Sequence, residues 1–254
     1  MTEDQPVETA GEPPPPPPPP TPPAAERFNL GRLFGFAFQD PKALSKFVIG
    51  SLMVVLIPLF GLGLLALLGF GVRTARGALR GDEHPMPDWD DFGGILFDGL
   101  KALGVIAGYA AAAIFLGLVL VGIGALWIVI GESMGSPALV ITSILGSVAG
   151  IIFLVFCALL VKALIPAGLL QLAATGRFSA AFRVNENLGW IRDSFGTYVL
   201  MLLTLVLFSI LADATVLLCI VGAIPGHFWW YTVGGATIGQ TGRLMGVRVE
   251  PGVG

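Results

Sequence analysis

Charged residues are scarce in this sequence of 254 amino acids, of which only 12% are Asp, Glu, Lys or Arg. A water-soluble domain carries about a quarter charged residues, because its surface has to stay hydrated. The mean hydropathy is +0.84 and 55% of the residues are hydrophobic. We therefore expect much of the protein surface to face lipid. The net charge of −3 is too small to indicate nucleic-acid binding.

Cysteine and histidine are also scarce. The two cysteines, Cys157 and Cys219, lie in apolar segments, and the two histidines are His84 and His227. Such cysteines are typical of small buried side chains and do not indicate a disulfide framework. The sequence has no HExxH motif, no CxxC motif and no phosphate loop. We expect no metal site and no cofactor, and a protein that is not an enzyme.

Residues 1–26 are acidic, polar and rich in proline, with eight consecutive prolines at Pro13–Pro20. Proline runs form stiff polyproline II without internal hydrogen bonds, so a disordered spacer is predicted. Docking into an aromatic groove of a partner is the alternative. The segment does not resemble a secretory signal, which has a positive start and an apolar core. Residues 27–246 are predicted to form a membrane helical domain, and residues 247–254 a short C-terminal tail.

Long apolar runs occupy most of the remaining sequence. They are Phe47–Val72, Leu103–Ile130, Ala138–Val161, Tyr198–Val221 and Phe228–Leu244. A helix needs about 20 apolar residues to cross the hydrocarbon core, and the helix satisfies its backbone in lipid. We predict an all-α, polytopic transmembrane helical bundle with four or five crossings. Arg27–Phe38 and Phe178–Arg192 are predicted to be amphipathic helices at the membrane interface.

The first apolar run has two interpretations, because Pro58 lies in its middle. Its length favours one kinked span, whereas the cations on both sides, Lys42 and Lys46 before it and Arg73 and Arg76 after it, favour a re-entrant hairpin. We adopt the kinked span; the side of the membrane on which residues 1–26 lie stays open. A second helix break is expected at Pro166.

The placement of cations predicts the orientation of the later crossings. The loops Gly131–Pro137 and Gly222–His227 lack Lys and Arg, whereas the segments before the second run and between the third and fourth runs carry them. Short loops with Lys and Arg stay in the cytoplasm, so these two loops are predicted to lie outside. The expected interfacial anchors are Trp127, Trp229 and Trp230 on the outer side, and Trp89 and Trp190 on the inner side.

Two charged residues fall inside apolar runs or at their ends. Asp213 lies in the fourth run and Lys162 follows the third. An acid at membrane depth is costly and is a candidate for proton or cation relay; a hydrogen bond inside the bundle is the structural alternative. Lys162 is expected to snorkel to the inner boundary. The acidic segment from Asp82 to Asp98 is interpreted as a solvated interfacial turn rather than a divalent-cation site.

Glycine pairs four residues apart let helices approach closely in a membrane. The sequence has 35 glycines, and three such pairs are Gly104 with Gly108, Gly146 with Gly150, and Gly235 with Gly239. These pairs are candidates for helix packing.

Several short motifs resemble a bacterial and archaeal membrane family known as domain of unknown function 4013. They are Phe38-Gln-Asp-Pro41, Lys46-Phe-Val-Ile-Gly50, Pro58, Gly71-Val-Arg73, Gly81, Met86-Pro-Asp-Trp89-Asp-Asp-Phe92 and Asp98-Gly-Leu-Lys101. The resemblance covers roughly residues 34–242 and is strongest over the first third. The family usually has leucine at the position of Met86 and a tyrosine near Phe70. The resemblance implies a multi-pass membrane protein and brings no activity.

Two hypotheses for the function follow. In the first, the protein is a non-enzymatic scaffold or assembly partner in the inner (cytoplasmic) membrane, in contact with lipid and with other membrane proteins or copies of itself. In the second, it is a small-solute or ion transporter or channel that uses Asp213 and the break at Pro58.

Overall fold

The computed structural model describes residues 28–58, 61–215 and 220–253, and these residues form helices without any strand. The elements are α1 (Leu30–Gln39), α2 (Ala43–Val55), α3 (Leu62–Arg80), the 3-10 helix η1 (Trp89–Asp91), α4 (Phe92–Ser133), α5 (Pro137–Thr175), the 3-10 helix η2 (Phe178–Phe182), α6 (Val184–Asp193), α7 (Phe195–Ala214) and α8 (Ile220–Leu244). The predicted all-α class is confirmed. The proline-rich tail lies outside the described residues.

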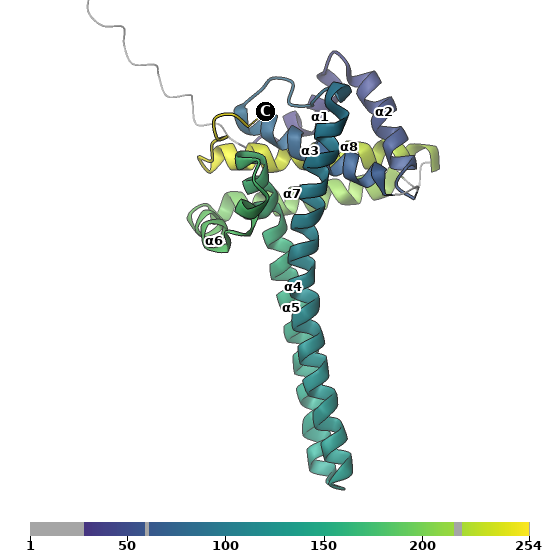
Figure 1. Ribbon diagram of the computed structural model, residues 1–254, viewed down its shortest axis with the longest axis vertical. Coiled ribbons are helices and arrows are strands. Elements are labelled where there is room, and N and C mark those ends of the chain that lie inside the picture. Colours follow the sequence, from purple (N-terminus) through teal and green to yellow (C-terminus); the bar gives the residue numbers. More distant parts are fainter. Residues whose placement is uncertain (1–27, 59–60, 216–219, 254) are drawn as a thin grey trace, which may run out of the picture.

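The chain forms a head and a long two-helix stalk (Figure 1). We call residues 110–161 the stalk, which is made of the distal parts of α4 and α5, and the other described residues the head. α4 has 42 residues, which corresponds to a length of about 60 Å at the α-helical rise. Among the described residues, four helices are long and apolar enough to cross a membrane: α3, α4 with the preceding η1, α5 and α7.

Local sequence signals fix the ends of the two long helices. Asp91 caps α4 by accepting a hydrogen bond from the backbone N–H of Gly94, and Ser136 caps α5 in front of Pro137. Such side chains satisfy the free N–H groups of a first turn, and proline fits there because it needs no partner. Gly135 at the stalk tip and Gly176 after α5 have φ values of 61° and 64°, which favour glycine.

The first apolar run does not form the one kinked helix that we predicted but two separate helices. α2 ends at Val55, α3 begins at Leu62, and Pro58 lies between them. The two helices fold back on each other: a Cβ built on Gly63 would lie 2.0 Å from the carbonyl oxygen of Met53. A proline removes a backbone donor and clashes with the preceding turn, which ends the first helix. The arrangement is a helical hairpin.

Glycines allow the close contacts of α3 with its neighbours. A Cβ on Gly235 or Gly239 of α8 would lie 2.2 or 2.1 Å from a carbonyl oxygen of α3, so this pair packs as predicted. Gly104 and Gly108 lie against the rings of Phe178 and Phe182 in η2, so this pair makes room for two aromatic side chains and not for a helix backbone. The third pair, Gly146 and Gly150, has no neighbouring group within 4 Å. It faces away from the described chain.

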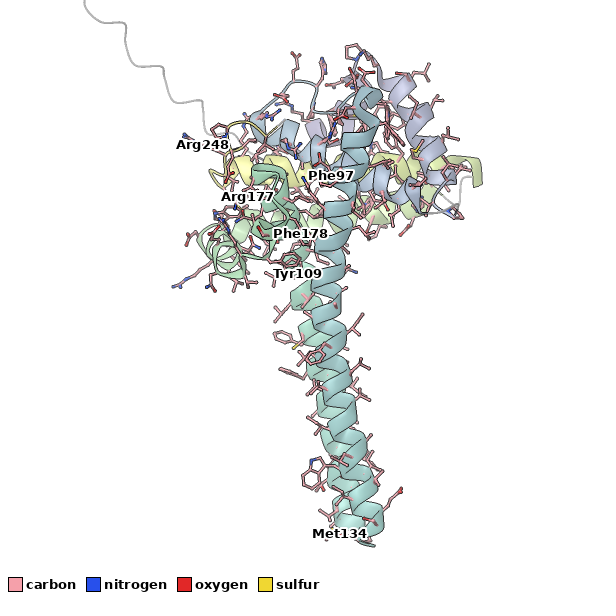
Figure 2. All side chains as sticks on the ribbon, viewed as in Figure 1. Phe97, Tyr109, Met134, Arg177, Phe178 and Arg248 are labelled. Atoms are coloured by element: carbon pink, nitrogen blue, oxygen red, sulfur yellow. The ribbon has the colours of Figure 1, made fainter. Side chains whose placement is uncertain are left out.

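The predicted interfacial helix after α5 is divided into η2 and α6, which dock at the base of the stalk (Figure 2). The hydroxyl of Tyr109 donates to the carbonyl oxygen of Ala181 at 2.9 Å and accepts from the side-chain amide of Asn187 at 3.2 Å. Asn187 is fully buried. The hydrogen bonds fix η2 and α6 against α4, since buried polar groups require partners.

Two further expectations about the helices change. α5 continues through Pro166 without a break; the buried Ala167 and Leu170 after it and the partly buried Leu164 and Ile165 before it pack into the core, where neighbouring helices support the proline. α8 begins at Ile220 and includes Pro225, so the predicted outer loop Gly222–His227 is helical and lies in the head. The C-terminal tail is docked, with the N–H of Glu250 donating to the carbonyl oxygen of Ala174 at 2.8 Å.

Candidate functional site

A buried lysine joins the start of α2 to the loop after α3. The Nζ atom of Lys46 lies 2.8 Å from Oδ2 of Asp40, 2.8 Å from the carbonyl oxygen of Met86 and 3.2 Å from Oδ1 of Asp88. Asp40 is extended before Pro41, as residues before proline prefer, and its Oδ1 accepts from the N–H of Lys42 at 2.8 Å. All three ammonium donors of Lys46 therefore have acceptors.

Lys42 extends this cluster to the surface. Its Nζ atom lies 2.7 Å from Oδ2 of Asp88, and both side chains are exposed. The hydrogen bond from Lys42, with that from Lys46, lowers the pKa of Asp88 below its ordinary value of 3.8. The same hydrogen bond raises the pKa of Lys42. Both groups stay charged at neutral pH, since each stabilises the ion of the other.

A second cluster surrounds Asp98 on α4. Oδ2 of Asp98 lies 3.0 Å from Nε of Arg73 and 3.4 Å from Nη1 of Arg76, and Oδ1 lies 3.6 Å from Nζ of Lys101. Arg73 also pairs with Asp91 at 2.8 Å. Asp98 and Arg76 are 7% and 3% exposed, so this carboxylate and guanidinium lie in the interior of the head. Charges survive such burial only when paired and hydrogen-bonded.

The second cluster also reaches the end of α5. Nε of Arg76 donates to the carbonyl oxygen of Ala173 at 3.1 Å, and Nζ of Lys101 donates to that of Gly176 at 3.0 Å. The last carbonyls of a helix lack partners inside the helix and attract cations. The cluster therefore connects α3 and α4 to the carbonyl end of α5, at the top of the long hairpin.

An aromatic group adjoins both clusters. The ring of Trp89 stacks on Phe70 at 4.7 Å between centroids, and both lie close to Phe228 of α8. Trp89 is two residues before Asp91 and one after Asp88, so its packing positions a carboxylate of each cluster. Trp89 was expected as a membrane-interface anchor; here it is partly buried and packs against the core of the head.

The other predicted interfacial anchors lie in different parts of the structure. Trp127 is 53% exposed on the stalk, whereas Trp229 is 7% exposed and contacts Phe34 and Phe208. Trp230 is half-buried beside Tyr231, also in the head, and Trp190 packs against the core at the base of the stalk. The predicted outer belt of Trp127, Trp229 and Trp230 does not hold, because α8 packs on α3 in the head and not beside the stalk tip.

Asp213 and Lys162, the charged candidates from the sequence, are not brought together. Asp213 lies one residue before the end of α7, and its side chain is 77% exposed. Its Oδ1 atom is 3.9 Å from Nε2 of His227. Lys162 is exposed on α5. Asp213 thus lies on the surface of the protein and not inside the bundle, because α7 presents this turn outward.

The acidic segment after α3 is exposed at Asp82, Glu83, Asp90 and Asp91, as expected for a solvated turn, but some of its acids have specific partners. Asp88, Asp91 and Asp98 are ion-paired, and Asp98 is buried. A signal was present in the sequence, since Lys46, Arg73 and Arg76 are cations inside or beside apolar helices and require nearby carboxylates.

Across the described ranges, no group of three His, Cys, Asp or Glu residues could hold a metal ion.

One match to a catalytic motif lies at the stalk tip, where residues 131–135 have the pattern Gly-x-Ser-x-Gly. This pattern forms a nucleophile only on a sharp turn between a strand and a helix. Ser133 is instead the last residue of α4, and its hydroxyl donates to the carbonyl oxygen of Ile130 at 2.8 Å. His84 and His227 lie in the head, far from this tip.

The fold defines the class: an all-α protein with helices apolar enough to span a membrane. More specifically, the chain belongs to the family described as protein of unknown function (DUF4013), whose model matches residues 28–224. The match includes both charge clusters and confirms the resemblance noted in the sequence. No curated protein and no solved structure matches the chain.

Proposed function

We propose that this protein is a multi-pass protein of the inner (cytoplasmic) membrane that acts as a non-enzymatic scaffold or assembly partner. The stalk carries the proposal, because its surface is apolar and Glu132 is its only charged residue. Large apolar side chains are exposed on both helices, among them Phe115, Leu118, Val121, Leu145, Ile152 and Phe156. Such a surface belongs in lipid or against other apolar helices.

The distribution of cations supports an orientation. The stalk has no Lys or Arg, whereas the elements of the head carry Lys42, Lys46, Lys101, Arg73, Arg76 and further arginines. Cations favour the cytoplasmic side. The head then lies at the cytoplasmic face and the stalk tip at Met134 on the outer face.

The charge clusters favour a structural role over chemistry. Each buried cation or carboxylate described above has a partner of opposite charge, and together they fix α2, α3, α4 and the end of α5 in one arrangement. An enzyme needs a group poised to react, and a transporter needs a polar path with exchangeable contacts. The alternative of a transporter that uses Asp213 is weakened by the position of this side chain on the surface of the head.

A crosslinking experiment tests the scaffold role. A photoreactive amino acid at Leu145 or Ile152, both exposed on the stalk, should capture discrete membrane proteins or a second copy of this chain in intact cells. The same amino acid at the buried Leu170 is the matched control, and we expect it to capture nothing. Lipid adducts alone from both stalk positions would contradict the proposal.

A flux assay tests the alternative. In liposomes that contain the purified full chain, we expect no ion or solute flux above that of empty liposomes. Flux that Asp213→Asn abolishes would establish the transporter and overturn the scaffold role.

A further inference from the structure

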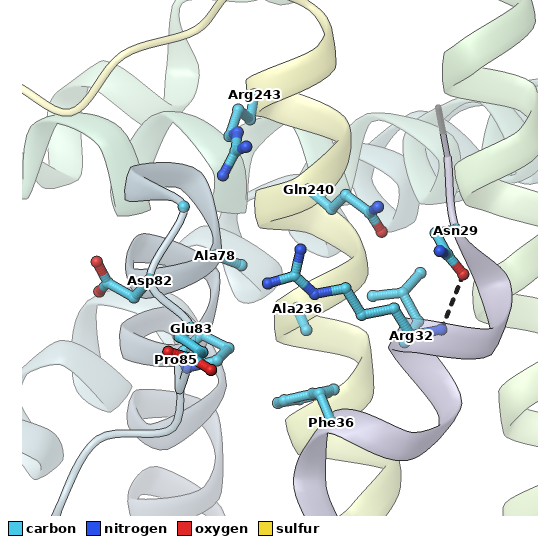
Figure 3. Close-up of a pocket in the computed structure, with 12 residues that line it drawn as sticks. Asn29, Arg32, Phe36, Ala78, Asp82, Glu83, Pro85, Ala236, Gln240 and Arg243 are labelled. Carbon is cyan, nitrogen blue, oxygen red and sulfur yellow. Dashed lines mark hydrogen bonds between the residues drawn. The ribbon is translucent and has the colours of Figure 1, made fainter. Parts of the chain in front are cut away.

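A cavity in the head remains outside the two charge clusters. Its volume is about 230 Å³, and it lies between α1, the loop after α3 and α8 (Figure 3). Its apolar wall includes Leu33, Phe36, Pro85 and Ala236. Its size suits a small polar group with a few heavy atoms rather than a drug-sized ligand.

Charges of both signs line this cavity. Arg32 comes from α1 and Arg243 from α8, whereas Asp82 and Glu83 belong to the loop after α3. Figure 3 shows the Arg32 side chain extending from α1 into the space, and Arg243 directed toward the same space from α8. The formal charges of these four side chains cancel. A ligand that carries one anionic and one cationic group would complement them.

The charged side chains of the cavity are paired differently from those of the clusters around Lys46 and Asp98. Arg32, Asp82 and Glu83 are exposed at the mouth of the cavity and form no ion pair with any residue in the described part of the chain, so their charges are available to a ligand. The Oε1 atom of Gln240 in the cavity wall is buried and has no hydrogen-bond partner among these residues. Several buried polar atoms of the described residues lack a partner, and the Gln240 oxygen is the one among them that belongs to the cavity lining, where a ligand group could pair with it.

The helix that supplies Arg32 indicates the source of the ligand. α1 buries Leu33, Phe36 and Ala37 against the head, yet its outer side exposes Leu30, Phe34 and Phe38 at 43%, 52% and 62%. A short helix that is apolar on its outer side is typical of the membrane interface. The cavity beside it then lies at the depth of the lipid headgroups.

We propose that this cavity binds the phosphate and ammonium groups of a zwitterionic phospholipid such as phosphatidylethanolamine. The phosphodiester contacts the guanidinium groups of Arg32 and Arg243, the ammonium contacts the carboxylate of Glu83, and the amide of Gln240 supplies a further polar contact. Guanidinium groups bind phosphate oxygens through paired, charge-assisted hydrogen bonds. The proposal goes beyond the scaffold role and does not depend on it.

Native mass spectrometry of the purified full chain tests the site. The probes are phosphatidylethanolamine, phosphatidylglycerol of the same acyl chains, and soluble phosphoethanolamine. We expect phosphatidylethanolamine to be retained preferentially. Arg32→Gln should weaken its retention about tenfold, as expected for one charge-assisted contact. Glu83→Gln should reduce the preference over phosphatidylglycerol, which has no ammonium group.

Arg192→Gln is the matched control, because Arg192 is exposed on α6 and does not line the cavity. It should leave retention unchanged. Equal retention of the two lipids, unaffected by Arg32→Gln, would overturn the site. If phosphoethanolamine bound as tightly as the lipid, the ligand would be a soluble compound with the same headgroup chemistry, and the assignment to a lipid would be wrong.

Discussion

The Nζ atom of Lys46 lies 2.8 Å from Oδ2 of Asp40, and the two side chains are only 6% and 4% exposed. This buried ion pair fixes the junction between α1 and α2 and, through Met86, the loop after α3. Removal of one partner from a buried pair leaves an uncompensated charge, which costs more than the pair contributes. The buried charges of the head are therefore its most sensitive positions.

Lys46→Met should lower the free energy of unfolding by about 3–5 kcal/mol, because Asp40 then stays buried without a cation. Thermal unfolding in detergent, followed by circular dichroism, measures the change. Lys42→Met is the matched control at the exposed end of the same cluster and should have little effect. Equal effects of the two substitutions would show that burial does not set the strength of this cluster.

Asp98→Asn should cost a similar about 3–5 kcal/mol, since Arg73 and Arg76 then lose their shared carboxylate. Arg76→Met should lower the unfolding free energy less in the Asp98→Asn variant than in the wild-type chain. In that variant Arg76 has already lost the carboxylate of Asp98. The double-mutant cycle of unfolding free energies gives this coupling. Simple additivity of the two changes would argue that Asp98 and Arg76 do not interact.

Some of this structure could be predicted from the sequence and some could not. The long uncharged run after Leu103 requires a helix in an apolar environment, so the stalk is visible in the local pattern. The pairing of Lys46 with Asp88 could not be predicted in this way, because the two residues are far apart in the sequence and no local period relates them. The same limit applies to Asp98, because two of its partners, Arg73 and Arg76, lie on α3.

The tryptophans illustrate a second limit. An aromatic residue at the end of an apolar run fits a membrane interface and a helix contact equally well. Trp89 and Trp229 have the sequence context of anchors, but the fold of α8 across α3 draws both into one aromatic core. Only the tertiary arrangement decides between these environments.

The close approach of α3 and α4 predicts a strong effect of one methyl group. A Cβ on Gly99 would lie 1.8 Å from the carbonyl oxygen of Leu65, so Gly99→Ala must move a helix backbone. We expect a loss of at least about 3 kcal/mol in unfolding free energy, at the upper end of overpacking effects. Gly93→Ala is the control on the same helix, with no group within 4 Å, and should be neutral or stabilising.

Acidification should remove the contribution of Asp88 to the stability of the fold. Its folded pKa is below the ordinary value of 3.8 because Lys42 and Lys46 donate hydrogen bonds to it. A carboxylate whose pKa is lower in the folded state stabilises the fold at any pH above its ordinary pKa. This stabilisation is lost as the pH falls through the pKa of the folded state. Asp88→Asn should therefore reduce the melting temperature at about pH 7 and have a smaller effect near about pH 3. A pH-independent difference between the two proteins would contradict this linkage.

The position of the stalk tip relative to the head tests the central claim most directly. In a chain with Cys157 and Cys219 replaced by alanine, single cysteines are introduced at Met134, which is exposed at the tip, and at Arg177, which is exposed in the head. A maleimide that does not cross membranes is then added to intact cells. We predict that Met134→Cys reacts in intact cells and that Arg177→Cys reacts only after lysis. Reaction of both cysteines in intact cells, or of neither, would contradict a stalk that crosses the bilayer from a cytoplasmic head.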